Sequence, residues 1–255
     1  MTSYSLVADV GATNARFALV EQGSTQLQQI KSLPCNNYPS LQEALADYLL
    51  NIDVEINAAC IAIAGAVHQA EFQLANNHWR VSKVAVDQLM QLEVLWINDF
   101  TAQAWAMSQV AEEDLLLVKS GLSVPHGNRL VMGPGTGLGV AGLVANGQGW
   151  LPVMGEGGHT SLAPANAMQC ELLQFMWQSY DHVSVERLLS GSGLMDLYAA
   201  VAHTQDKPPA ITHVADLVEK AQSVSPDPLA RKTLEVFCAM LGHAVANAAL
   251  LYGAV

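Results

Sequence analysis

The fold is decided by the stretch Leu92-Glu-Val-Leu-Trp-Ile-Asn-Asp-Phe-Thr101. Residues 92–97 form a short apolar run, which is typical of a buried strand. Two polar residues, Asn98 and Asp99, follow directly, and a helical pattern then runs from Thr101 to Met107. A carboxylate where a buried strand ends has little water around it, which suits a general base. Asn98 or Asp99 could equally cap the helix, so this stretch alone leaves both roles open.

Composition restricts the class of protein. The chain has 255 residues, of which 51% are hydrophobic and 13% charged, so a sizeable core is expected. The net charge is −12 and no Lys/Arg-rich run occurs, which argues against a nucleic-acid partner. The four cysteines show no Cys-x-x-Cys spacing and are interpreted as reduced thiols. We find no signal peptide and no apolar run judged long enough to span a bilayer, so we expect a cytoplasmic protein with no membrane partner.

A glycine turn near the start of the chain is the first candidate ligand site. Residues 5–11 predict a strand, Gly11-Ala-Thr-Asn14 a turn, and the following residues a second strand. Such a hairpin exposes amides and a hydroxyl to a ligand, and Asp9 is close enough to hold a metal ion directly or through water. An ordinary hairpin with an Asx-stabilised turn is the alternative.

A second glycine loop, Gly133-Pro-Gly-Thr-Gly-Leu-Gly139, follows another predicted strand. Its glycines let the backbone approach a phosphate closely. Residues 137–142 also match the dinucleotide fingerprint formally, but that fingerprint must open a helix. Residues 140–144 predict the second strand of a hairpin, so we discount a dehydrogenase. The loop is not a Walker A motif, because no Gly-Lys-Ser/Thr follows.

A polar cluster on an open backbone follows at Gly155-Glu-Gly-Gly-His159. Glu156 and His159 could hydrogen-bond a polyol or could be two metal ligands, although no third ligand stands at a suitable spacing. A structural histidine beside an exposed glutamate is the simpler alternative. The crowding of glycines favours a site.

The element pattern predicts an α/β protein with two domains. Hairpin strands followed by alternating helices and strands indicate a mixed sheet with helices packed against it. The pattern loosens around residues 109–128, so we place one α/β domain at 1–109 and a second at 110–255. Beyond residue 163 the chain is predicted to be helical. A long helix is expected from about Leu229 to Tyr252, with Ala244–Leu251 deeply buried.

Taken together, these motifs resemble those of bacterial glucokinases and occur in the same order. The match rests on Asp9-Val-Gly-Ala-Thr-Asn14, Ile97-Asn-Asp-Phe100, Gly133–Gly139 and Gly155–His159, and Ser184-Val-Glu-Arg-Leu-Leu-Ser-Gly191 extends it. The resemblance covers nearly the whole chain. It implies the actin-like, ribonuclease H-like ATPase fold, with two α/β domains and a cleft between them for ATP and sugar.

The resemblance also implies roles for individual residues. Asp99 matches the general base that takes the proton from the 6-hydroxyl of glucose, and Asp9 matches the position that organises Mg²⁺ through water. The positions that match sugar-binding residues are Asn98, Asp99, Glu156, His159 and Glu186. Those that match the nucleotide-binding segments are Asp9, Gly11, Ala12, Thr13, Asn14, Gly133, Gly135, Thr136 and Gly137. The implied function is phosphorylation of glucose by ATP with Mg²⁺, the first step of glycolysis.

The sequence departs from the family pattern in two places. Ala12 replaces a glycine in the first phosphate motif, where a methyl group restricts the turn. The family's glycine-rich adenosine-binding segment has no counterpart before Val255, so we expect a shortened chain that binds ATP poorly. The family often forms homodimers, and glucose is the favoured hexose. The alternatives are a non-catalytic sugar-binding protein and a sugar-responsive regulator of the related kinase and repressor family. The regulator would need a DNA-binding segment before residue 5 and a Cys-rich zinc motif.

Overall fold

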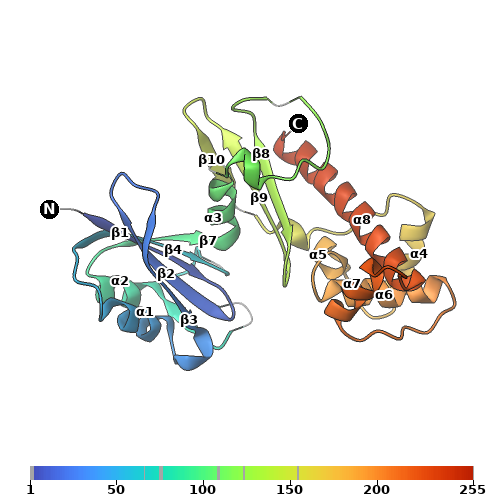
Figure 1. Cartoon of the computed structure of the whole chain (residues 1–255), viewed down its shortest axis with the longest axis horizontal. Coiled ribbons are helices and arrows are strands. Elements are labelled where there is room, and N and C mark those ends of the chain that lie inside the picture. Colours follow the sequence, from blue (N-terminus) through green and yellow to red (C-terminus); the bar gives the residue numbers. More distant parts are fainter. Residues whose placement is uncertain are drawn as a thin grey trace. The chain divides into compact units, whose positions relative to one another are not determined.

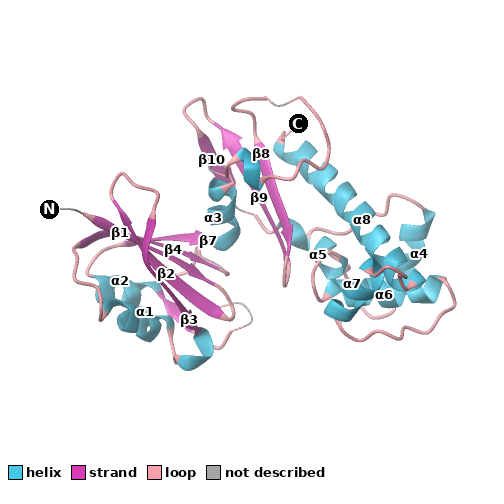
Figure 2. Ribbon diagram, in the orientation of Figure 1, coloured by secondary structure: helices cyan, strands magenta, loops and turns pink. Residues whose placement is uncertain are grey.

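The computed structural model describes residues 3–65, 67–74, 77–107, 110–122, 124–153 and 155–254. The chain divides into two compact units, Met1–Ala106 (unit 1) and Met107–Val255 (unit 2). Each unit has its own hydrophobic core. Figure 1 labels most of the elements, Figure 2 separates helices from strands, and each unit is described by itself below.

Unit 1 is built on a five-stranded mixed sheet in the order β3-β2-β1-β4-β7. The N-terminal strands β1, β2 and β3 form antiparallel hairpins, whereas β4 and β7 continue the sheet parallel to β1. A short hairpin of β5 and β6, absent from the sequence prediction, lies outside this sheet. The strands are β1 (Tyr4–Val10), β2 (Asn14–Glu21), β3 (Leu27–Pro34), β4 (Ile56–Ile63), β5 (Glu71–Gln73), β6 (Arg80–Ser82) and β7 (Val94–Asn98).

Two helices of unit 1, α1 and α2, lie together against the sheet (Figure 2). Along β1 the buried Leu6, Ala8 and Val10 alternate with more accessible residues, as expected for a strand with one face on the core. Phe17 of β2 stacks on Tyr48 of α1 with ring centroids 5.2 Å apart. The helical segments are η1 (Cys35–Asn37), α1 (Leu41–Leu49), α2 (Lys83–Met90) and α3 (Asp99–Ala106), of which α3 packs on β4 and β7.

Unit 2 contains a three-stranded antiparallel sheet in the order β10-β9-β8. Its strands are β8 (Arg129–Pro134), β9 (Leu138–Ala145) and β10 (Trp150–Val153). The second glycine loop therefore joins two strands, with Pro134 opposite Leu138 in the register. This confirms the predicted hairpin, and the formal dinucleotide fingerprint at residues 137–142 opens no helix.

The remainder of unit 2 is helical, as predicted. Its core lies between the sheet and the helices, where Leu138 and Val140 of β9 meet apolar side chains such as Leu188, Leu197 and Met240. The helical segments are η2 (Glu112–Asp114), η3 (Gly157–His159), α4 (Ala167–Met176), α5 (Val185–Leu188), α6 (Gly193–Thr204), α7 (Val214–Gln222) and α8 (Pro228–Tyr252).

The long helix α8 differs from its prediction in burial. It forms as expected, with Asp227 accepting a hydrogen bond from the amide of Ala230 and Gly253 ending the helix at φ 62°. Its second half is not deeply buried: Leu250 is 72% exposed and Leu251 85%. The prediction was wrong because α6, α7 and the strands β8 and β9 contact α8 but leave these leucine side chains uncovered. By length and composition α8 is apolar enough to cross a membrane, contrary to the sequence expectation, although such a single helix is weak evidence.

Candidate active site

The first glycine turn closes the β1–β2 hairpin with its carbonyl groups facing protein donors. The amide of Gly11 donates to the carbonyl of Asn14 at 3.0 Å. The carbonyl of Ala12 accepts from Asn77 Nδ2 at 2.6 Å, and that of Thr13 accepts from the amide of Cys35 at 2.9 Å. With these acceptors satisfied, backbone N–H groups and the Thr13 hydroxyl are the groups of the turn suited to an anion.

Ala12 fits this turn without backbone strain. Its φ is not among the positive values that disfavour side chains, and neither is that of Gly11. The methyl group of Ala12, at the position where the resemblance implies a glycine, therefore leaves the local conformation intact.

Asp9 lies one residue before the end of β1 and is directly opposite Arg16 in the β1–β2 register. Its Oδ2 accepts a hydrogen bond from Arg16 Nη1 at 2.7 Å, and both side chains are more than half exposed. No group of three or more metal-ligating side chains occurs in the part of the chain that the structure describes. A single exposed carboxylate beside a turn whose amides suit an anion fits Mg²⁺, which keeps several waters and can take other ligands from substrate phosphates.

The structure assigns the capping role at the end of β7 chiefly to Asn98. Its Oδ1 accepts from the amides of Phe100 at 2.9 Å and Thr101 at 3.3 Å, the two N–H groups that an N-cap satisfies. Asp99 Oδ1 also accepts from the amide of Phe100, at 2.8 Å. Because this bond engages one of the two carboxylate oxygens, capping does not prevent Asp99 from acting on a substrate.

The pKa of Asp99 is raised above the ordinary value of an aspartate. Burial is the main cause, the hydrogen bond from the amide of Phe100 opposes it, and the negative charge of Asp9 raises the pKa further. The sheet explains why the charge of Asp9 reaches Asp99. Strands β1 and β7 lie on either side of β4 and run parallel to it, and Ala62 of β4 is paired with both Asp9 and Ile97. A carboxylate with a raised pKa is a stronger base.

The second glycine hairpin is held by the segment that contains α5. The amide of Gly135 donates to the carbonyl of Gly137 across the tip, and the amide of Gly191 donates to the carbonyl of Gly135, both at 2.8 Å. The amide of Leu138 donates to Glu186 Oε2 at 2.7 Å. Two hydrogen bonds, made by Glu186 and Gly191, therefore hold the loop against the Ser184–Gly191 motif. Sequence reasoning missed both of them.

Three of the sequence-predicted sugar residues come together in unit 2. His159 lies between two carboxylates: its Nε2 is 4.0 Å from Glu156 Oε2 and its Nδ1 is 3.9 Å from Glu186 Oε1. Residues 160–162 pair with residues 183–185 through backbone hydrogen bonds, and this pairing places η3 beside α5. Glu156 is 78% exposed and Glu186 30%, so the cluster opens to solvent on the Glu156 side.

The glycines of this cluster have a packing role. A Cβ at Gly158 would collide with the backbone carbonyl of Leu138, and one at Gly157 would lie 2.9 Å from Val140 Cβ. Gly157 and Gly158 thus let η3 approach β9 closely. The crowding of glycines, which the sequence analysis took as a sign of a site, is explained by this contact.

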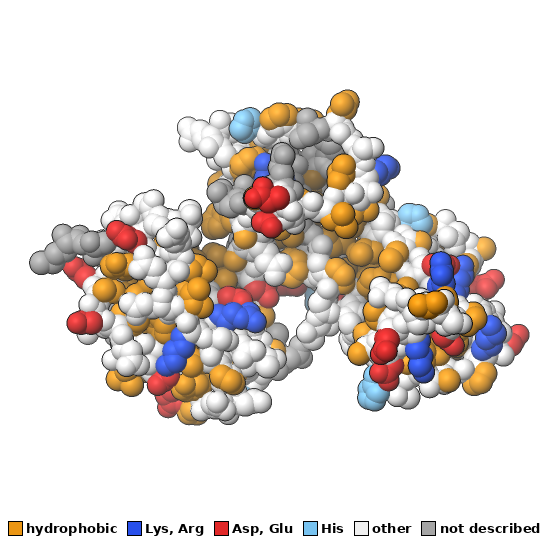
Figure 3. Space-filling model, in the orientation of Figure 1, with side chains coloured by type: hydrophobic (Ala, Val, Ile, Leu, Met, Phe, Trp, Pro, Cys, Tyr) orange, Lys and Arg blue, Asp and Glu red, His pale blue; other side chains and the backbone are white. Residues whose placement is uncertain are grey.

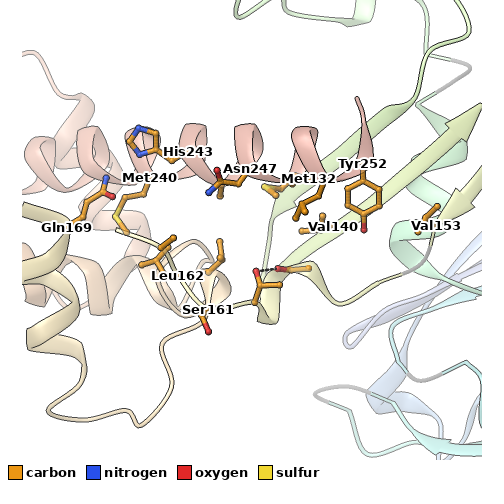
Figure 4. Close-up of a pocket in the computed structure, with 17 residues that line it drawn as sticks. Met132, Val140, Val153, Ser161, Leu162, Gln169, Met240, His243, Asn247 and Tyr252 are labelled. Atoms are coloured by element: carbon orange, nitrogen blue, oxygen red, sulfur yellow. Dashed lines mark hydrogen bonds between the residues drawn. The ribbon is translucent and has the colours of Figure 1, made fainter. Parts of the chain in front are cut away.

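A cavity of about 540 Å³ lies next to this cluster in unit 2 (Figure 4). One wall is α8, from which Met240, His243 and Asn247 face the cavity, and strand residues such as Val140 contribute to the other side. Its lining is mostly apolar and contains none of Glu156, His159 and Glu186. A hexose needs partners for several hydroxyl groups, so this cavity suits it less well than the polar cluster.

The site residues predicted from the sequence therefore form two groups, one in each unit. Asp9, the turn Gly11–Asn14, Asn98 and Asp99 lie at the edge of unit 1 where β1 and β7 end. The other group contains the tip of the β8–β9 hairpin and the cluster around His159 in unit 2. Gly133 belongs to β8, opposite Gly139, and Gly135, Thr136 and Gly137 form the tip.

Comparison with known proteins identifies the family. The family model described as "Glucokinase" matches residues 6–255. The glucokinase of Chromohalobacter salexigens is 43% identical over 256 residues, which span 100% of this chain and 80% of that protein. The glucokinase of Hahella chejuensis is 42% identical over 253 residues, which span 98% of this chain and 78% of that protein.

A solved structure agrees with the sequence comparison. The crystal structure of glucokinase from an Antarctic psychrotroph has a TM-score of 0.85 and 33% sequence identity, and the match covers 98% of this chain and 80% of that one. The predicted α/β, actin-like ATPase fold is thereby confirmed. The chain belongs to the glucokinase family.

Proposed function

We propose that this chain transfers the γ-phosphoryl group of ATP to the 6-hydroxyl of glucose, giving glucose 6-phosphate and ADP. The family is one of ATP-dependent hexose kinases. The observation that carries the proposal is the family match over residues 6–255. Asp99, a partly buried carboxylate with a raised pKa directly after β7, supplies the chemistry that the reaction needs.

In this proposal Asp99 is the general base. The carboxylate oxygen that does not bind the amide of Phe100 accepts the proton of the sugar 6-hydroxyl. At the same time the oxygen of that hydroxyl attacks the γ-phosphorus and ADP leaves. The capping bonds to Asn98 hold the start of α3 and so fix the direction of the neighbouring carboxylate. Positioning of this kind, together with charge neutralisation, supplies most of the catalysis in phosphoryl transfer.

Glucose recognition is assigned to Asn98, Asp99, Glu156, His159 and Glu186. Two carboxylates, each within 4.0 Å of the same imidazole, offer acceptors and donors for adjacent hydroxyl groups. A sugar that covers one of these groups and leaves it without a partner binds less tightly, because taking a polar group out of water without a new hydrogen bond is costly.

The phosphates of ATP are assigned to the two glycine turns, Gly11–Asn14 and Gly133–Gly137. Asp9 would hold Mg²⁺, through water, and the ion supplies charge neutralisation at the phosphates. Arg16 already pairs with Asp9 and adds a cation at the same turn. A phosphate site made of amides and a metal ion is compatible with the net charge of −12.

We further propose a cytoplasmic homodimer with no nucleic-acid or membrane partner. Acidic and basic side chains are interspersed over the visible face of both units in Figure 3, which offers no basic surface for a phosphate backbone. Helix α8 packs on α6 and α7, and this packing supports its role as a helix of unit 2 and not as a membrane span.

Detection of the reaction product tests the proposed function. Purified chain is incubated with glucose and Mg·ATP, and the phosphorus NMR spectrum is recorded. We expect the resonances of glucose 6-phosphate and ADP. With 6-deoxyglucose, which lacks the acceptor hydroxyl, we expect no sugar phosphate. Glucose binding without any product would refute the kinase and favour the non-catalytic sugar-binding alternative.

A further inference from the structure

The carboxylate of Glu186 contacts two parts of the proposed site at once. Oε2 accepts the hydrogen bond from the amide of Leu138, where the β8–β9 hairpin leaves its glycine tip. Oε1 faces the imidazole of His159, 3.9 Å away and beyond hydrogen-bonding distance. One oxygen is therefore engaged by the glycine hairpin, and the other is directed to the cluster assigned to the sugar.

The contact with the hairpin is specific. A hydrogen bond from an amide to a carboxylate is stronger than one between neutral groups, and the Glu186 side chain is only 30% exposed. Gly137 makes room for it, because a Cβ there would collide with Oε2 and lie 3.1 Å from Cδ. A side chain at position 137 would therefore push the carboxylate away from Leu138.

We propose that Glu186 is a positioning residue that couples sugar binding to the conformation of the β8–β9 glycine hairpin. A sugar hydroxyl that donates to Oε1 would fix the carboxylate, and through Oε2 the same carboxylate would hold Leu138 and the hairpin tip. Sugar binding then tightens nucleotide binding, and linkage requires that the nucleotide tightens sugar binding by the same factor. This coupling rests on the function proposed above.

Glu156 provides a matched control. It belongs to the same cluster, at 4.0 Å from His159 Nε2, but it is 78% exposed, and no hydrogen bond among the described residues joins its side chain to the hairpin. Glu156→Ala and Glu186→Ala both remove a carboxylate next to His159. Only Glu186→Ala removes the partner of the Leu138 amide.

The first measurement needs no ligand. Hydrogen exchange of the Leu138 amide is followed by NMR in protein labelled with ¹⁵N-leucine. We expect Glu186→Ala to accelerate this exchange by about tenfold or more, because the amide loses its acceptor. Glu186→Gln, which keeps an acceptor oxygen, should have a smaller effect, and Glu156→Ala should leave the rate within about twofold of wild type.

The second measurement is the coupling factor, which is the ratio of the nucleotide affinity with glucose to the affinity without it. Binding of Mg·AMP-PNP is measured by calorimetry with and without saturating glucose. We expect glucose to raise the affinity of the wild-type chain about fivefold or more. The factor should fall towards one in Glu186→Ala and persist in Glu156→Ala once glucose is saturating.

Gly137→Ala keeps the inference testable if Glu186→Ala does not fold. The added methyl group displaces the carboxylate without deleting it, so the variant should reproduce both the faster Leu138 exchange and the loss of coupling. Unchanged Leu138 exchange in the folded variants, or equal coupling factors for Glu156→Ala and Glu186→Ala, would overturn the inference. A wild-type chain that makes no glucose 6-phosphate would refute the proposed function, whereas exchange in the ligand-free variants would still decide the role of Glu186.

Discussion

Gly158→Ala tests whether η3 is placed by close packing on β9. The new Cβ would collide with the carbonyl oxygen of Leu138 and lie 3.2 Å from both its carbonyl carbon and its Cβ. Backbone atoms cannot rotate aside as a flexible side chain can, so η3 must move away from the strand. Overpacking of this kind typically costs about 1–3 kcal/mol. For a unit of this size, this corresponds to a fall in Tm of roughly 2–12 °C.

The displacement should also affect ligand binding. Because η3 ends at His159, a shift of this segment moves the imidazole relative to Glu186, and glucose affinity should fall together with stability. Gly149→Ala is the matched control. It adds the same methyl group to the same unit, where no atom lies within 4 Å, and should change stability by no more than about 0.5 kcal/mol.

The assay is a urea titration followed through the amide resonances of β9, which report on unit 2 alone, with glucose affinity measured by calorimetry on the same samples. If Gly158→Ala and Gly149→Ala have equal urea midpoints and equal glucose affinities, the close contact between η3 and β9 does not place the cluster.

Three further changes have defined outcomes. Asp99→Asn should raise the stability of unit 1 at pH 7, because the partly buried carboxylate there has a raised pKa and its charge opposes folding. The gain should disappear below about pH 4, where aspartate is protonated in the unfolded chain as well, and urea titrations at both pH values test this. Asp9→Asn should move the acid limb of the pH profile of kcat/KM for glucose, measured with saturating Mg·ATP, to lower pH, because it removes a negative charge that raises the pKa of Asp99. An acid limb at the wild-type pH would exclude this effect of Asp9 on Asp99. Gly242→Ala, inside α8 with no atom near the new methyl group, should stabilise unit 2 by about 0.5–1 kcal/mol in thermal unfolding, and a lower Tm would contradict it.

Much of the fold was predictable from local patterns. The run before Asn98 forms β7, and the two glycine turns join adjacent strands, because alternation and glycine turns are properties of short stretches. The choice between a cap and a base at residues 98–99 could not be made locally. The structure shows that Asn98 caps α3, whereas the amide of Phe100 engages Oδ1 of Asp99 and leaves Oδ2 outside this bond.

Long-range contacts could not be predicted. The hydrogen bond from the amide of Leu138 to Glu186 joins residues 48 positions apart, and no local sequence pattern predicts it. The packing role of Gly158 depends on the position of β9 in space. The burial of Ala244–Leu251 was mispredicted because apolar composition favours a helix and a covered face but does not specify which neighbours cover it.

Asp99→Asn, assayed for both glucose binding and turnover, tests the central claim most directly. Asn has the same shape as Asp but cannot take a proton from the 6-hydroxyl. The account predicts that glucose affinity is nearly unchanged while kcat falls by about 10²–10⁴-fold. Asp114→Asn, at an exposed aspartate of η2, serves as the control and should keep the wild-type kcat. A kcat for Asp99→Asn within about threefold of wild type would contradict the assignment of Asp99 as the general base.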